Sequence, residues 1–194
     1  LKNPSKSLNS LCNFVAPFGS KDKAKAAEIG IFALSYSLRD YEIADTAFLS
    51  FESTVFSNII VGWLKGLTKR ERPNTIDDPF DFHFDDAYSQ KMSSSAFPSG
   101  DVMTAFSFAS VIAARSESLT IAVVSYSLAG LVAFERVYLN VHWLSDVLVS
   151  AAIATVIGKA IVKFNSAPQE QSNIAFIPII TEEGGIGGGI VLRF

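Results

Sequence analysis

Three separated stretches of the sequence carry side chains suited to the chemistry of phosphate groups. The first reads KGLTKRERP and holds a lysine and an arginine separated by six residues. The second, PSG, precedes an apolar-periodic run, and the third reads ERVYLNVHWLSD. The positions of interest in them are Lys65, Arg72, Ser99, Gly100, Arg136, His142 and Asp146.

Together these groups could carry out phosphoryl transfer. Backbone N–H groups at a helix that starts after Ser99 and Gly100 form an anion site. The forked donors of two arginines match phosphate oxygens, and a lysine adds a point charge. A histidine whose second nitrogen is held by a carboxylate is oriented and nucleophilic, as His142 would be by Asp146. The set predicts a phosphohistidine intermediate at His142, with no metal or other cofactor.

Each stretch taken alone also has an ordinary explanation. The cations of the first stretch, Arg70 among them, suit a solvated helix C-terminus, where the helix dipole favours positive charge. Ser99 could be a simple helix N-cap. Arg136 could pair with Glu135 or with an aspartate of the loop before the second stretch. A histidine and an aspartate at i and i+4 on one helix, as in the third stretch, are more often structural than catalytic.

The three stretches resemble the signature of the type 2 phosphatidic acid phosphatase superfamily, which includes bacterial class A acid phosphatases, lipid phosphatases and vanadium haloperoxidases. The order Lys-x6-Arg-Pro, Pro-Ser-Gly-His and Arg-x5-His-x3-Asp is matched here over residues 65–146. The resemblance implies an all-α helical bundle of the acid phosphatase/vanadium haloperoxidase type. It also implies that His142 is the nucleophile and that Asp146 orients it. The implied phosphate-binding positions are Lys65, Arg72, Ser99, Gly100 and Arg136.

The sequence departs from that signature at one catalytic position. Asp101 stands where the family has the histidine of Pro-Ser-Gly-His, which by resemblance protonates the leaving oxygen. The helix dipole stabilises a first-turn carboxylate as the anion by about 0.3–1 kcal/mol, which opposes proton donation. We therefore expect Asp101 to be a poor acid and turnover to be slow, since a positioned acid contributes roughly 10²–10⁴-fold. The other histidine, His83, lies in an aspartate-rich loop and is expected to have no catalytic part.

The composition indicates which partners and which surroundings, water or membrane, suit the chain. Of its 194 residues, 49% are hydrophobic and 18% are charged, and the formal net charge of −3 gives no global sign of a nucleic-acid partner. The longest uncharged run covers residues 118–134, which is shorter than the about 20 apolar residues that a membrane-spanning helix needs. The sequence therefore favours a helical bundle in water over a membrane-spanning one. Cys12 is the only cysteine, so no internal disulfide forms.

Hydrophobic periodicity and helix-terminating residues predict helices at about 21–37, 40–65, 100–115, 118–136 and 142–163. Residues 1–20 are expected to be an irregular lead-in and residues 74–96 a long polar loop. After a linker at 165–172, alternating apolar residues and glycines predict a β-hairpin packed on the bundle. We predict a helical phosphatase domain over residues 1–164 and a small C-terminal hairpin-like extension over residues 165–194.

Three functions remain open at this point. The first is a metal-independent phosphatase that hydrolyses a lipid or small-molecule phosphate monoester and is weakened by Asp101. The second is a non-catalytic phosphate or phospholipid binder that keeps the pocket without its acid. The third is vanadate-dependent halide oxidation in the same anion cradle, although such enzymes are usually much longer.

The start of the chain bears on its location. Because the chain starts at Leu1 rather than Met, we expect that an N-terminal segment has been removed. The protein is then expected to be exported, and either periplasmic or membrane-associated. A peripheral contact with a membrane is left open.

Overall fold

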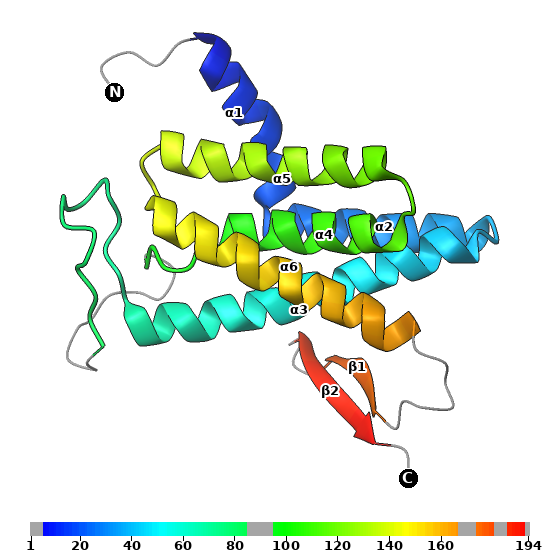
Figure 1. Ribbon diagram of the computed structural model, residues 1–194. Helices are drawn as coiled ribbons and strands as arrows, with labels where there is room; N and C mark the ends of the chain where they lie inside the picture. Colours follow the sequence, from blue (N-terminus) through cyan, green and yellow to red (C-terminus); the bar gives the residue numbers. More distant parts are fainter. Residues whose placement is uncertain (1–5, 85–94, 167–173, 181–185, 193–194) are drawn as a thin grey trace.

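The computed structural model of the protein describes residues 6–84 and 95–166 with their side chains, and the backbone alone of residues 174–180 and 186–192. The helices are α1 (Lys6–Gly19), α2 (Lys21–Ser37), α3 (Tyr41–Thr68), α4 (Gly100–Arg115), α5 (Leu119–Tyr138) and α6 (Leu144–Ser166) (Figure 1). The strands β1 (Ile174–Ile180) and β2 (Ile186–Leu192) pair antiparallel, with Ile174 opposite Leu192.

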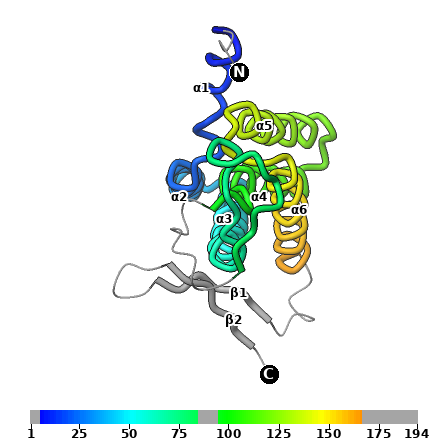
Figure 2. The backbone as a smooth tube through the Cα atoms, turned by 90° about the vertical axis from the view of Figure 1, so that its left-hand side faces the viewer, coloured from blue at the N-terminus to red at the C-terminus, as the bar shows by residue number. Residues whose placement is uncertain are grey.

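The central element is α4, around which α2, α3, α5 and α6 run side by side (Figures 1 and 2). Consecutive helices alternate in direction, and α1 crosses them steeply. Val102, Met103 and Thr104 are consecutive in α4, so they point to different sides of the helix, and all three are fully buried. A helix that is buried all round belongs to the core of a bundle. The end of α3, the start of α4, the end of α5 and the start of α6 therefore meet at one end of the bundle.

The all-helical architecture predicted from the sequence is confirmed, and the five predicted helices occur with ends shifted by up to three residues. The irregular lead-in predicted for residues 1–20 is wrong, because α1 occupies most of it. Val15 of α1 packs with Ala129 and Val132 of α5, and this contact stabilises a helix that its own residues favour only weakly. Pro17 lies in the last turn of α1, where it cannot donate an intrahelical hydrogen bond, and the helix ends two residues later at Gly19.

The C-terminal extension stays a prediction. Its two strands have the backbone register given above, but its side chains lie outside the described part of the chain, as do most residues of the predicted linker. The predicted polar loop has neither helix nor strand over residues 74–84, and residues 85–94 are outside the described residues.

Small hydroxyl side chains fill much of the interface between α3 and the helices around it. Ser107 Oγ donates to Ser57 Oγ at 2.6 Å, and Thr54 Oγ1 donates to Glu28 Oε1 at 2.8 Å. Buried residues of this kind are Ser50, Ser53, Thr54, Ser57, Thr104, Ser107 and Ser110. Small residues let helices approach closely and hydrogen-bond to one another, which is typical of helix packing in membranes.

The outer surface is correspondingly apolar. Within the described residues, α3, α5 and α6 are each long and apolar enough to cross a membrane. In the most apolar window of α5 only 17% of the residues are buried. The large exposed apolar residues of α5 are Leu119, Ile121, Val123, Val124, Phe134 and Val137. These three apolar helices suggest membrane association.

The sequence-based preference for a bundle in water is therefore corrected. That preference rested on uncharged runs, and each of these helices carries charged residues that shorten such runs. In α5 the charges sit in the last turns, where Glu135 is buried and Arg136 reaches the cavity described below. Charges that face the inside of a bundle do not prevent a helix from crossing a bilayer.

We expect the protein to remain in the membrane pellet after an alkaline carbonate wash and to be released by a non-ionic detergent. The reason is that transfer of the exposed apolar side chains of α3, α5 and α6 into water is unfavourable. Sedimentation followed by immunoblotting measures this. A monodisperse monomer in detergent-free buffer would contradict it.

Candidate active site

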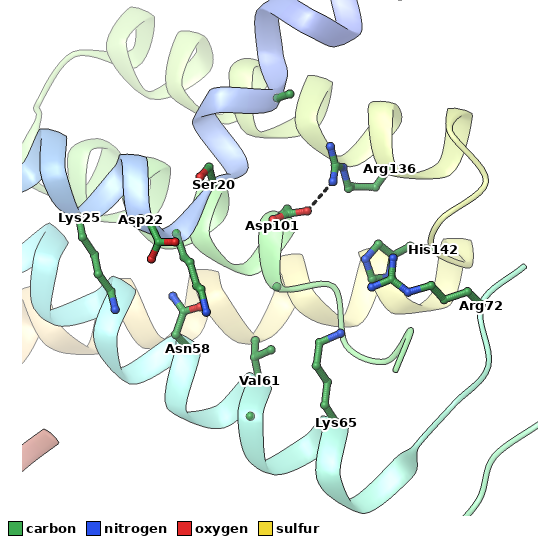
Figure 3. Close-up of a pocket in the computed structure, with 14 residues that line it drawn as sticks. Ser20, Asp22, Lys25, Asn58, Val61, Lys65, Arg72, Asp101, Arg136 and His142 are labelled. Carbon is green, nitrogen blue, oxygen red and sulfur yellow. Dashed lines mark hydrogen bonds and ion pairs between the residues drawn. The ribbon is translucent and has the colours of Figure 1, made fainter. Parts of the chain in front are cut away.

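A cavity of about 720 Å³ opens near the end of the bundle where the end of α3, the start of α4, the end of α5 and the start of α6 meet (Figure 3). Six residues singled out from the sequence line it: Lys65, Arg72, Gly100, Asp101, Arg136 and His142. The other two, Ser99 and Asp146, are fully buried, and each is next to a lining residue: Ser99 directly precedes Gly100, and Asp146 Oδ2 lies 3.6 Å from His142 Nδ1. The structure therefore brings together residues from α3, α4, α5 and the turn before α6. His83 does not line this cavity, and its Nε2 lies 3.2 Å from Asp81 Oδ1.

The end of α3 positions the segment that leads into α4. Lys65, on the last turns of α3, donates from Nζ to the carbonyl oxygen of Ser95. Thr68 Oγ1 lies 3.1 Å from the carbonyl oxygen of Phe97. Lys69 then ends the helix in a left-handed conformation with φ of 38°. Arg70 follows this turn, and its carbonyl oxygen accepts the Ala96 N–H at 2.8 Å. Residues 95–97 are thus hydrogen-bonded to the end of α3 and to the turn that follows it.

Ser99 lies directly before α4, as expected, but its side chain forms no cap hydrogen bond. The Ser99 N–H donates to Ser150 Oγ at 2.8 Å, so this amide is not available to an anion. The Ser99 Oγ is buried and has no hydrogen-bond partner among the described residues. The N-cap explanation of Ser99 therefore lacks its hydrogen bond.

His142 lies in the turn before α6 and not on the helix that the sequence predicted to start there, because α6 begins at Leu144. Its Nδ1 is 2.7 Å from the carbonyl oxygen of Ala96 and 3.6 Å from Asp146 Oδ2. A carbonyl oxygen can only accept, so Nδ1 carries the proton of a neutral ring and Nε2 carries the lone pair. The Ala96 carbonyl thus fixes the tautomer, and Asp146 adds a nearby negative charge.

Asp146 is held by a residue that the sequence analysis did not single out. Its carboxylate forms a buried ion pair with Arg70 Nη1, and its Oδ2 accepts the Trp143 N–H at 2.8 Å. Arg70 is only 3% exposed, and its guanidinium lies 4.7 Å from the ring centre of Phe82 and 5.5 Å from that of Trp143. The explanation of Arg70 as a solvated cation is therefore wrong. Nothing in the spacing signals this contact, because its partners lie up to 76 residues away.

Asp101 contacts Arg136 in the lining of the cavity (Figure 3). Its Oδ2 lies 2.5 Å from Arg136 Nη1, while the other nitrogens of this guanidinium contact Glu135. The alternative that Arg136 pairs with Glu135 is thus correct in part, since Arg136 is held between two carboxylates. Asp101 is 37% exposed, whereas Glu135 is 2% exposed. Of the two carboxylates, only that of Asp101 lines the cavity that a ligand would enter.

Burial and positive charge lower the pKa of His142 from its ordinary value of 6.5. Desolvation of the imidazolium is the largest cause, and the charges of Lys65 and Arg72 add to it. Asp146 opposes the shift through its hydrogen bond and its charge. His142 is therefore neutral at pH 7, which is the form that carries a nucleophilic lone pair. In the part of the chain with described side chains, no three His, Cys, Asp or Glu residues are grouped so as to hold a metal ion.

Residues 46–169 match the family model of the PAP2 superfamily, and the chain belongs to that superfamily. The resemblance inferred from the three stretches is thereby confirmed. The crystal structure of Aquifex aeolicus LpxE has a similar fold, with a TM-score of 0.61 and 22% sequence identity over 84% of this chain and 90% of that one. The curated proteins contain no match to the chain.

We expect the His142 imidazole to titrate below pH 6.5 in a His83→Gln variant, which leaves one histidine in the chain. Carbon-detected NMR of the ring measures the midpoint. In addition, Lys65→Met should raise the midpoint, because it removes a positive charge that disfavours the imidazolium. A midpoint above 6.5, or a fall in the Lys65→Met variant, would show that the electrostatics of the site are not as described.

Arg70→Gln should lower the free energy of unfolding by about 3–5 kcal/mol, because it leaves the carboxylate of Asp146 buried without its counter-ion. The matched control is Arg115→Gln. Arg115 Nη2 lies 3.0 Å from Asp45 Oδ2 in a partly exposed ion pair, and such pairs contribute about 0.2–1 kcal/mol. Denaturant titration in detergent micelles compares the two. Equal losses would mean that the Arg70 pair is no more important than a surface pair.

Proposed function

We propose that the protein is a phosphatase that hydrolyses a lipid phosphate monoester through a phosphohistidine at His142. The observation that carries this proposal is the position of His142, with its Nε2 lone pair, in the same cavity as Lys65, Arg72 and Arg136. Membership of the PAP2 superfamily supports a phosphatase independently of this geometry.

In the proposed reaction, the substrate phosphate binds between Lys65, Arg72 and Arg136. His142 Nε2 attacks phosphorus, the bond from phosphorus to the alcohol oxygen breaks, and that oxygen takes up a proton from solvent, which the water of the second step returns. Water then attacks the phosphohistidine and releases inorganic phosphate and the neutral imidazole. The Ala96 carbonyl and Asp146 stabilise the positive charge that develops on the ring.

Asp101 weakens this reaction in two ways. As an anion paired with Arg136, it does not supply the proton that the leaving oxygen needs. It also competes with the substrate phosphate for the same guanidinium. A non-catalytic phosphate binder remains the second candidate, and it is favoured by the presence of Asp101 in place of a proton donor beside the cations of the cavity.

The lipid nature of the substrate is supported by a shallow apolar groove of about 530 Å³ on the outer face of α3. The groove shares Asn58 and Gly62 with the catalytic cavity. Its other lining residues are Ile59, Trp63, Gly66 and Leu67. Trp63 is 74% exposed, and α3 is one of the three helices that could cross a membrane. A hydrocarbon chain could therefore run from a phosphate in the cavity along α3 into the bilayer.

Asp101→His should raise kcat/KM for an alkyl phosphate strongly, toward the roughly 10²–10⁴-fold that a positioned acid supplies. The gain should be smaller for p-nitrophenyl phosphate, whose leaving group needs no proton. Asp101→Asn is the matched control, because it frees Arg136 without supplying an acid. His142→Ala should abolish turnover of both esters between pH 4 and 8.

Three outcomes of these assays are decisive. An equal gain from Asn and His at position 101 would mean that release of Arg136, and not proton donation, limits the rate. Turnover that survives His142→Ala would end the phosphohistidine proposal. Phosphate binding without turnover in either the wild-type chain or Asp101→His would favour the binder.

Gly62→Leu should reduce kcat/KM for a long-chain alkyl phosphate and leave that for a short, water-soluble phosphate within about twofold. The added side chain would fill the groove, and a Cβ at this position meets no atom within 4 Å, so the fold should tolerate it. Gly130→Leu in α5 is the matched control, since a Cβ there is equally unobstructed and lines neither cavity nor groove. Equal effects of the two variants on the long-chain ester would contradict a chain-binding groove on α3.

A further inference from the structure

One flank of α1 leaves large apolar side chains exposed. Phe14 is 63% exposed and Phe18 is 44% exposed, and their rings contact edge to face at a centroid distance of 5.9 Å. The two stand at i and i+4, and Leu11 lies three residues before Phe14, so all three share one side of the helix. Cys12 and Val15 are the residues of α1 that are buried against the bundle beside this flank. The packing of α1 thus leaves both phenylalanine rings largely uncovered.

The opposite flank of α1 is polar and borders the catalytic cavity. Ala16 lines that cavity. Successive residues of an α-helix are about 100° apart, so Phe14 and Phe18, two positions on either side of Ala16, lie about 160° around the helix from it. Asn9 and Asn13 share the side of Ala16, and Asn13 is exposed. Helix α1 therefore has a polar flank on the side of the cavity and an apolar flank on the side away from it.

The direction of α1 fits a position at the surface of a bilayer. Figures 1 and 2 both show α1 running across the bundle, whereas α5 and the helices next to it run along the bundle. Helices that cross a membrane stay close to the bilayer normal, and α3, α5 and α6 are long and apolar enough to do so. In that orientation α1 lies near the plane of the membrane, with its polar flank toward water and its phenylalanine flank toward the acyl chains.

The surface of α2 changes from charged to apolar close to α1. Helix α2 begins two residues after α1 ends, and Lys21, Asp22 and Lys23 in its first turn are exposed. The large exposed residues farther along α2 are apolar or aromatic, namely Ile29, Ile31, Phe32, Leu34 and Tyr36. The first turns of α2 line the catalytic cavity, so its apolar part is again the part away from the cavity. Both helices thus place the boundary between water and hydrocarbon at the same end of the bundle.

We propose that α1 is an interfacial anchor, which inserts Phe14 and Phe18 into the boundary between headgroups and acyl chains of one leaflet and so fixes the depth of the catalytic cavity. Helices with one apolar and one polar side bind at this boundary. The bilayer is the partner because α1 packs on α5 and leads into α2, and the exposed surfaces of both helices are apolar. The inference rests on membrane association and not on the proposed reaction.

The close contact of α1 with α4 couples the depth of the anchor to that of the cavity. A Cβ atom at Gly19, the last residue of α1, would lie 2.9 Å from Asp101 Cβ and 2.8 Å from Val132 Cγ1. Glycine is therefore required for the end of α1 to lie this close to the first turn of α4. Because Ala16 and Asp101 both line the cavity, α1 and the cavity move as one unit relative to the bilayer.

Spin labels on the two flanks of α1 test the anchor without requiring turnover. Cys12 is the only cysteine, so Cys12→Ala gives a background in which Phe14→Cys, Phe18→Cys, Asn9→Cys or Asn13→Cys carries a single label. The full chain is reconstituted in vesicles of phosphatidylcholine and phosphatidylglycerol. Power-saturation EPR then compares the collisions of each label with oxygen, which concentrates among acyl chains, and with a nickel chelate, which stays in water.

Two further labels give the reference values. Val123→Cys on the exposed surface of α5 is the lipid reference, and Asp77→Cys in the exposed polar loop is the water reference. Labels at positions 14 and 18 should collide mainly with oxygen, as at position 123. Labels at positions 9 and 13 should collide mainly with the nickel chelate, as at position 77.

The depth of the cavity is tested by a label on the exposed Lys23, in the first turn of α2. In Phe14→Ser/Phe18→Ser, the collisions of a Lys23→Cys label with the nickel chelate should increase, because the catalytic end of the bundle moves toward water. The matched control is Asn9→Ser/Asn13→Ser on the polar flank of the same helix, which should leave these collisions unchanged.

The possible results separate the anchor from the membrane association on which it rests. A label at position 123 that behaves as in water would overturn both. A lipid-like label at position 123, together with water-like labels on both flanks of α1, would overturn the anchor alone. So would equal or reversed behaviour of the two flanks. Labels at positions 14 and 18 that neither reagent reaches would show that protein covers this flank, which contradicts the bilayer as its partner. Equal changes at position 23 in the two double variants would overturn the control of depth by α1.

Discussion

The buried ion pair between Arg70 and Asp146 holds together the three stretches that carry the candidate site residues. The Arg70 side chain holds Asp146 at the start of α6, and its carbonyl oxygen holds the Ala96 N–H in the segment before α4. The Ala96 carbonyl in turn holds His142 Nδ1. Arg70, which follows α3, thus connects the start of α6 with the segment before α4. Both charges are shielded from water. Loss of either partner therefore leaves an uncompensated buried charge, which is strongly destabilising.

The surroundings of Arg70 explain how its charge is accommodated. Its guanidinium lies against the rings of Phe82 and Trp143, whose faces attract a cation. Its Nη2 donates to the carbonyl oxygen of Pro79. The Arg70 side chain is therefore one of the contacts that hold the polar loop after α3 to the site, although the loop has neither helix nor strand over its described part.

The sequence predicted the residues that line the catalytic end of the cavity but not the contacts that position them. Lys65, Arg72 and Arg136 were predictable because their residue types and spacing form a recognisable sequence pattern. Arg70 was not, since it looks like any cation at a helix C-terminus until its distant partners are known. The Ala96 carbonyl was not either, because a backbone acceptor has no sequence signal. Likewise α1 and the apolar outer surface depend on tertiary contacts and on which way charged residues face.

Asp101 is the one site residue that departs from the family signature. Its ion pair with Arg136 weakens the proposed reaction but leaves the other contacts of the site in place. In the proposed reaction His142 carries the phosphoryl group during turnover. Rapid acid-free quench of the enzyme with a ³²P-labelled alkyl phosphate, followed by peptide mapping, tests it most directly. We expect an acid-labile, base-stable label on the peptide that contains His142, and no label in His142→Ala. A label that persists in His142→Ala, or inorganic phosphate formed in a burst with no labelled protein, would contradict the account.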